Sequence, residues 1–113
     1  MHILAVSNSG GLFHTIRKQD GTWGQFGDVF AATNALGNLT QVTATSIGYD
    51  LHVVAVADGK AFHTVRLANG TWTKFGQISS ASVPNVTAAA AANVKGELQV
   101  TVISGGKPYH TIR

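Results

Sequence analysis

The chain has 113 residues, 44% of them hydrophobic and only 12% charged, which limits it to one ordinary domain. Its net charge of +3 comes from basic residues that are spread along the chain, which argues against nucleic acid as a partner. Cysteine is absent, which excludes disulfides and thiolate metal sites, and no apolar run approaches the ~20 residues of a membrane-inserted helix.

Three strands are predicted in the first part of the chain, over residues 1–6, 11–17 and 21–29. The first begins without a basic segment, so we expect no signal peptide, and the compartment stays unknown. Gly10-Gly11 and Asp20-Gly21 separate the three strands, and both pairs accept the positive φ angles of a type I′ turn. A polar connection over residues 31–39 follows.

A complete set of four strands is predicted next, over residues 41–45, 51–56, 60–66 and 70–78. The second of these is almost continuously apolar, which indicates burial on both faces of a sheet. Turns at Asp58-Gly59 and Asn69-Gly70 again suit type I′ geometry. The set ends in a second polar connection, residues 79–84.

The last three strands are predicted over residues 85–89, 98–103 and 107–113, with a turn at Gly105-Gly106. The alanine run 88–92 could alternatively form a turn of helix, since alanine is the best helix former. We favour a strand because residues 86–88 align with Val-Thr-Ala at 42–44.

A repeat underlies this order of strands. The pattern aromatic-His-Thr-aliphatic-Arg occurs at residues 13–17, 62–66 and 109–113, with steps of 49 and 47 residues between the histidines. A period near 48 suits a four-stranded unit and predicts an all-β fold built of antiparallel β-propeller blades. Residues 1–113 then form a single propeller segment of about 2.5 blades: a partial blade at 1–29, a full blade at 40–78 and a partial blade at 85–113.

Two or three blades cannot close a ring, and an open array exposes strand edges and blade faces. We therefore expect copies of the chain to associate into a homo-oligomer with an even number of blades, such as a trimer or tetramer. The last predicted strand pair, over residues 98–103 and 107–113, repeats the first pair, over residues 1–6 and 11–17. One of these two pairs would therefore be displaced or exchanged between copies. A fragment or engineered piece of a longer propeller is expected rather than a native self-assembling protein.

Two phrases resemble the tectonin-like β-propeller lectins of bacteria: Phe-His-Thr-Ile-Arg at 13–17 and Gly-x-Trp-x-x-Phe-Gly-Asp-Val at 21–29. The resemblance covers the whole chain, and nine residues separate His from Trp in both full copies. It implies binding of L-fucose or O-methylated sugars in shallow pockets between adjacent blades. The chain departs from the family in having two full units and in carrying Gln77-Ile78 where the first unit has Asp28-Val29.

Candidate sugar-binding residues follow from the repeat and from its polar connections. An indole packs well against the apolar face of a sugar, while nearby polar groups fix its hydroxyls. Histidine and arginine could donate hydrogen bonds at a pocket floor, and short polar side chains of the connections suit neutral sugars. The candidates are Trp23, Trp72, His14, His63, Arg17, Arg66, Asn34, Asn38 and Ser80.

A structural role competes with each of these assignments. The tryptophans could wedge blades together, the histidines could bond to a neighbouring blade, and the arginines could pair with an acid there. Three histidines nearly 50 residues apart diverge around a ring, so no shared metal site is expected. No cofactor is expected either.

Catalysis is not expected, because the five acidic residues offer no evident pair of carboxylates for glycoside hydrolysis. We therefore expect a multivalent, non-enzymatic carbohydrate-binding protein, a lectin. The alternative is a self-assembling propeller scaffold, or an engineered fragment, that binds no ligand. Glycans and other copies of the chain are the expected partners, without nucleic acid or membrane insertion.

Overall fold

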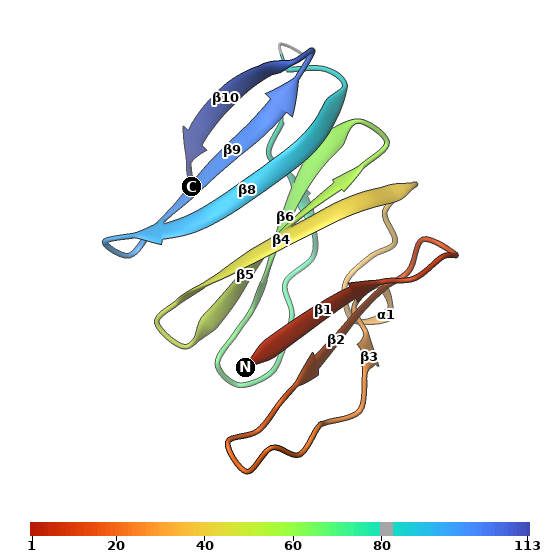
Figure 1. The fold of residues 1–113 in the computed structure, drawn as a ribbon, viewed down its shortest axis with the longest axis vertical. Coiled ribbons are helices and arrows are strands. Elements are labelled where there is room, and N and C mark those ends of the chain that lie inside the picture. The colour runs from red at the N-terminus through yellow and green to blue at the C-terminus, as the bar shows by residue number, and fades with distance from the viewer. Residues whose placement is uncertain (80–82) are drawn as a thin grey trace.

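A computed structural model describes residues 1–79 and 83–113, in which ten strands form three separate antiparallel sheets (Figure 1). The first sheet has the order β1-β2-β3, the second β4-β5-β6-β7, and the third β10-β9-β8. The strands are β1 (His2–Val6), β2 (Leu12–Ile16), β3 (Gly27–Asp28), β4 (Leu39–Ile47), β5 (Asp50–Ala57), β6 (Lys60–Arg66), β7 (Gly76–Gln77), β8 (Val86–Val94), β9 (Glu97–Ser104) and β10 (Lys107–Ile112). The predicted all-β class and the number of strands are confirmed.

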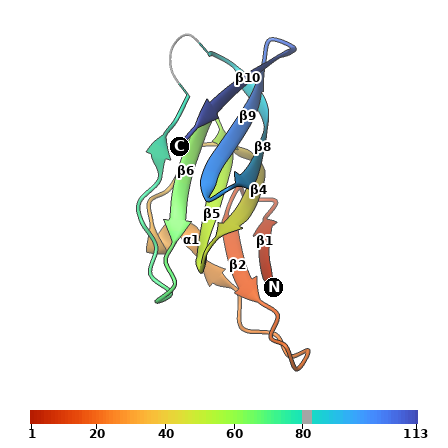
Figure 2. The same cartoon turned by 90° about the vertical axis from the view of Figure 1, so that its left-hand side faces the viewer.

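The sheets follow one another along the longest axis of a flattened body of 44 × 36 × 21 Å (Figures 1 and 2). The N-terminus lies on the first sheet and the C-terminus on the third (Figure 1). Both hairpins at the ends of the chain, β1-β2 and β9-β10, form part of their own sheets. Each chain therefore contributes three sheets, and neither hairpin is displaced in the single chain.

The alanine run lies in a strand, as predicted, because it is paired along its length. Ala90 is opposite Thr101 and Ala92 is opposite Gln99 in the β8-β9 ladder. Strands β4 and β8 are both longer than the predicted segments 41–45 and 85–89. Small side chains let β4 and β8 approach each other, and the Gln41 side chain accepts a hydrogen bond from Ala89 N–H at 2.7 Å between the sheets.

The predicted strands over residues 21–29 and 70–78 are largely wrong. Only β3 and β7, two residues each, pair with a neighbour, together with isolated bridges from Arg17 to Trp23 and from Arg66 to Trp72. Single backbone hydrogen bonds, such as Gly24 N–H to the Ile16 carbonyl, and side-chain bonds from Thr15 and Thr64 hold these segments in place of a continuous strand ladder. Residue 29, the last of the predicted strand 21–29, instead begins the short helix α1 (Val29–Ala32), which the Asp28 side chain caps by accepting from Ala31 N–H.

The turns are of two kinds. Asp58-Gly59 and Gly105-Gly106 have positive φ at both residues, as a type I′ turn requires. At the other three predicted sites, Gly10-Gly11, Asp20-Gly21 and Asn69-Gly70, only one glycine has positive φ, so type I′ geometry is wrong there. In the last two, the Asp or Asn side chain accepts hydrogen bonds from the threonine that follows the glycine.

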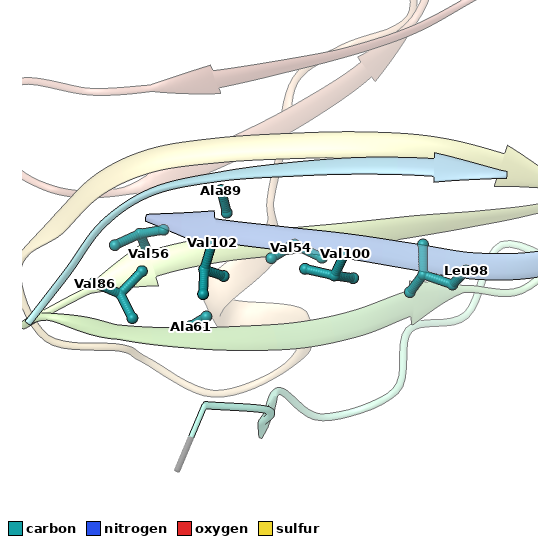
Figure 3. Close-up of a cluster of buried hydrophobic side chains, with 8 residues drawn as sticks. All are labelled: Val54, Val56, Ala61, Val86, Ala89, Leu98, Val100 and Val102. Carbon is teal, nitrogen blue, oxygen red and sulfur yellow. The ribbon is translucent and has the colours of Figure 1, made fainter. Parts of the chain in front are cut away.

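Two apolar clusters form the core, one at each junction between neighbouring sheets. Figure 3 shows the cluster between the second and third sheets, where Val54 and Val56 of β5 lie near Val100 and Val102 of β9. The cluster between the first and second sheets includes Leu12, Val29, Leu39, Ala55 and Phe75. Because β5 contributes to both clusters, its nearly complete burial follows from packing on both faces, as its apolar sequence predicts.

In the described part of the chain, the one helix has four residues, and no helix is long and apolar enough to cross a membrane.

Candidate binding site between the first and second sheets

Each sheet pairs the histidine of its repeat motif with a side chain on the adjacent strand. His2 Nδ1 and His14 Nε2 are 2.9 Å apart in the first sheet, and His52 Nδ1 and His63 Nε2 are 3.0 Å apart in the second. The imidazole rings of both pairs are stacked, with centroids 5.1 and 5.2 Å apart. In the third sheet Gln99 replaces the first histidine, and its Oε1 contacts His110 Nε2. The motif histidine therefore has a fixed partner in every sheet.

The motif arginine reaches the histidine of the preceding sheet. Arg113 Nε donates to His63 Nδ1 at 2.8 Å, which joins the third sheet to the second. A guanidinium can only donate, so Nδ1 of His63 accepts, and a neutral His63 ring carries its proton on Nε2. That proton is donated to His52 Nδ1, which completes a chain of three side chains across the junction.

At the first junction the equivalent residues, His14 and Arg66, lie near each other and line one cleft. Burial, followed by the positive charge of Arg66 and the proximity of His2, lowers the pKa of His14 to about 4. Burial, followed by the charge of Arg113 and the proximity of His52, lowers the pKa of His63 to about 4 as well. Both motif histidines are thus neutral at physiological pH. The arginines face imidazoles in place of the carboxylates expected as structural partners.

The motif threonine anchors the segment that follows its strand. Thr15 Oγ1 donates to the Gly24 carbonyl at 2.7 Å, and Thr64 Oγ1 donates to the Thr73 carbonyl. Both threonines are buried. This contact sets the position of the tryptophan that precedes the anchored residue, and it explains why the histidine-to-tryptophan spacing is the same in both full copies.

The two tryptophans lie in different surroundings. Trp72 and His14 form a T-shaped ring pair, with centroids 5.4 Å apart and planes at 82°, and Trp72 also contacts the apolar cluster between the sheets. Trp23 is 55% exposed, and the guanidinium carbon of Arg17 lies 5.8 Å from its ring centroid. Trp72 therefore belongs to a junction within the chain, while Trp23 lies on the outer side of the first sheet.

An open cleft of about 310 Å³ lies at the first junction. It brings together three of the predicted residues: His14 from the first sheet, and Arg66 and Trp72 from the second. The remaining lining residues are Thr15, Ile16, Lys18, Gly24, Gln25, Gly27 and Gly70. This volume is at the lower end of the range for small-molecule sites, about 300 to 1,000 Å³.

The other predicted residues do not line this cleft. His63 is buried at the second junction, and Arg17 lies over Trp23. Asn34 has a structural bond, because its Oδ1 accepts from Phe75 N–H at 2.8 Å. Asn38 is exposed in the connection before β4, where its N–H donates to the Asp58 carboxylate at 3.0 Å. Ser80 lies outside the described residues.

Sequence reasoning missed the partners of the motif and part of the cleft. His2 and His52 hold equivalent places in two copies of the repeat, and that equivalence was the signal for their pairing with His14 and His63. Lys18 and Gln25 lie in segments with no strand pairing, and the sequence carries no pattern that would place them in a cleft.

Within residues 1–79 and 83–113, no group of three histidine or acidic side chains is close enough to hold a metal ion. Comparison of the chain with protein-family models, curated proteins and solved structures finds no match. The chemistry of the cleft residues is therefore the basis for a functional proposal.

Proposed function

We propose that this chain is a carbohydrate-binding protein and that the cleft between its first and second sheets is a sugar site. One observation carries the proposal: side chains of two successive repeats, His14, Arg66 and Trp72, meet at one open cleft. An aromatic ring beside polar side chains is the mixture that sugar sites use, since a sugar has both apolar C–H faces and hydroxyl groups.

The lining favours a ligand rich in hydrogen-bond acceptors. Arg66 and Lys18 can only donate, and no carboxylate is among the ten lining residues. A methyl ether oxygen only accepts, and its methyl group can pack on an apolar surface. Neutral sugars of the fucose type with O-methyl groups therefore suit the cleft. Gln25 offers both a donor and an acceptor for a free hydroxyl.

We further propose that the three sheets are blades of a β-propeller that closes by association of copies. Support comes from the two junctions, at each of which neighbouring sheets pack face to face and a motif arginine lies near the motif histidine of the preceding sheet. With three sheets per chain, two copies supply six blades. If one end hairpin were displaced by strand exchange, three copies would be needed for the same number.

Several clefts in one ring would raise the avidity for a surface that carries many sugars. Linked sites typically gain a factor of about 10² to 10⁴ over a single site when the geometry lets them bind together. Each cleft would then need only weak affinity.

A scaffold without ligand is the second candidate, and the second junction favours it. There Arg113 and His63 join two sheets although the chain has no third tryptophan. The His-Arg contact can thus serve packing alone.

Calorimetric titration with L-fucose and with an O-methylated fucose tests the proposal. We expect the natural chain to bind both sugars. The variants Trp72→Ala and Gln25→Ala should each bind at least about tenfold more weakly, and a tenfold loss corresponds to about 1.4 kcal/mol. Gln25 is exposed, so its truncation leaves the packing of the sheets intact.

Tyr49→Ala is the matched control, because Tyr49 is an exposed aromatic residue in the β4-β5 turn and does not line the cleft. The affinity of this variant for both sugars should equal that of the natural chain. Absence of binding to both sugars by a folded natural chain would leave the scaffold as the better account.

A further inference from the structure

We propose that a second copy of this chain docks its first sheet on the outer face of the third sheet. In this contact Arg17 of one copy donates to His110 of the other, and Trp23 comes to lie beside the same histidine. The contact would build a further cleft of the first-junction type, with side chains from two molecules. The inference rests on the face-to-face packing in the proposed function and deepens it by naming the residues.

The Nδ1 atom of His110 is available to accept a hydrogen bond from such a donor. The Gln99 amide oxygen can only accept, so His110 donates to it from Nε2. A neutral imidazole then keeps Nδ1 as an acceptor. This is the same proton arrangement as in His63, whose Nδ1 accepts from Arg113 at 2.8 Å while its Nε2 faces His52. The ring of His110 is exposed, so its Nδ1 can be reached.

The outer face of the third sheet is uncovered, whereas the equivalent face of the second sheet is covered by the third sheet. The outward-facing residues of β10, at positions 108, 110 and 112, are exposed, whereas the equivalent positions 61 and 63 of β6 are buried and position 65 is half-buried. Pro108, His110 and Ile112 alternate along the face of β10 that corresponds to Ala61, His63 and Val65 of β6. The Ile112 side chain is 56% exposed, so the outer face of the third sheet presents apolar surface beside His110.

The outer face of the first sheet carries the complementary half. Arg17 corresponds to Arg66 and Arg113, the two arginines that approach a histidine of the preceding sheet. Trp23 corresponds to Trp72, which forms a T-shaped ring pair with His14. Both Arg17 and Trp23 are exposed, and the guanidinium carbon of Arg17 lies over the Trp23 ring, 5.8 Å from its centroid. One chain therefore carries both halves of a junction on opposite faces.

The contact between copies would be weaker than the internal junctions. Strands β4 and β8 pack against each other at the second junction and are linked by the Gln41 side chain. The first sheet has only β1, β2 and β3, so a strand equivalent to β8 is missing from its side of the new contact. Association should therefore depend on protein concentration.

Mass measured against concentration tests the contact, with the 113-residue chain and its variants Arg17→Ala and His110→Ala. We expect the natural chain to reach at least twice its mass of 11.8 kDa as concentration rises. Each variant should need at least about tenfold more protein to associate, which corresponds to about 1.4 kcal/mol.

Mixing the two variants sharpens the test. Arg17→Ala retains His110, and His110→Ala retains Arg17, so an equimolar mixture restores one complete contact and should give 1:1 heterodimers. Lys74→Ala is the control, since it removes one exposed positive charge that has no part in the contact. Natural-like association of either variant, or a mixture that stays monomeric while the natural chain associates, would overturn the inference.

Sugar binding is measured on the same samples to separate the two proposals. The Arg17→Ala chain keeps the cleft of His14, Arg66 and Trp72, so it should bind L-fucose as a monomer. If no variant binds sugar but association still depends on Arg17 and His110, the proposed function fails and the docking contact stands.

Discussion

At the scale of single residues, each position of the motif has a separate structural task. The histidine pairs with its neighbouring strand, the threonine anchors the following segment, and the arginine reaches the preceding sheet. These tasks give the motif a structural use that does not depend on a ligand, although Thr111 and Arg17 do not perform them within the single chain.

The threonine anchor gives the first prediction. Replacing Thr64 by valine keeps the shape of the side chain but leaves the Thr73 carbonyl without this donor. We expect the free energy of unfolding to fall by about 1–3 kcal/mol in urea denaturation. Thr111→Val is the matched control, because Thr111 holds the same place in the third copy and is exposed. Equal effects of both substitutions would contradict the assigned role.

The neutral histidines give a pH dependence. In the folded chain the pKa of His14 and of His63 is about 4, below the ordinary 6.5, so the unfolded chain binds more protons between these values. Their contribution to stability is complete above about pH 6.5 and is lost as the pH falls to about 4. With partial solvent screening, we expect a loss of about 1–2 kcal/mol for each.

Unfolding measured from pH 7 to pH 4 checks this expectation. The double variant His14→Gln, His63→Gln should show a smaller fall in stability than the natural chain, because an amide does not titrate. His110→Gln serves as the comparison, since His110 is exposed. A double variant whose stability falls as steeply as that of the natural chain would refute the assignment.

At the scale of elements, the turns decide how well the strands pair. Lys95 and Gly96 join β8 to β9 with φ angles of 54° and 85°, the signs that a type I′ turn requires. Lysine is a poor choice at such a position, whereas asparagine tolerates it well. Lys95→Asn should therefore raise the free energy of unfolding by about 0.5 kcal/mol in urea denaturation. A decrease would show that the lysine has another role.

The strands were predictable wherever a ladder of backbone hydrogen bonds holds them. Apolar runs bounded by glycine turns located β5 and β9, and alignment of the repeats correctly assigned the alanine run to β8. The segments after Arg17 and Arg66 were not predictable in the same way. They are held by isolated backbone hydrogen bonds and by the Thr15 and Thr64 side chains, and a local sequence pattern does not show such contacts.

The candidate site was predictable in part for a related reason. The repeat pointed to histidine, arginine and tryptophan, and His14, Arg66 and Trp72 do line one cleft. The polar connections were a weaker guide, because the Asn34 side chain bonds to Phe75 and Asn38 lies in the connection before β4, away from the cleft. Only the packing of one sheet on the next determines which copies of a repeated residue meet.

At the scale of the whole molecule, the chain is an array of three sheets with one type of junction used twice. The same arrangement leaves an arginine face at one end and a histidine face at the other. Head-to-tail contacts of this kind form rings if the rotation between copies closes and filaments if it does not. The proposed propeller corresponds to the closed case.

The indole N–H signals of the Arg17→Ala chain, recorded by NMR during titration with L-fucose, test the central claim most directly. Trp72 and Trp23 are the two tryptophans of the chain, so two signals report on the cleft and on the outer face. The account predicts that the Trp72 signal shifts in a saturable way while the Trp23 signal stays in place. Two unmoved signals, or a shift of Trp23 alone, would contradict a sugar site between the first and second sheets.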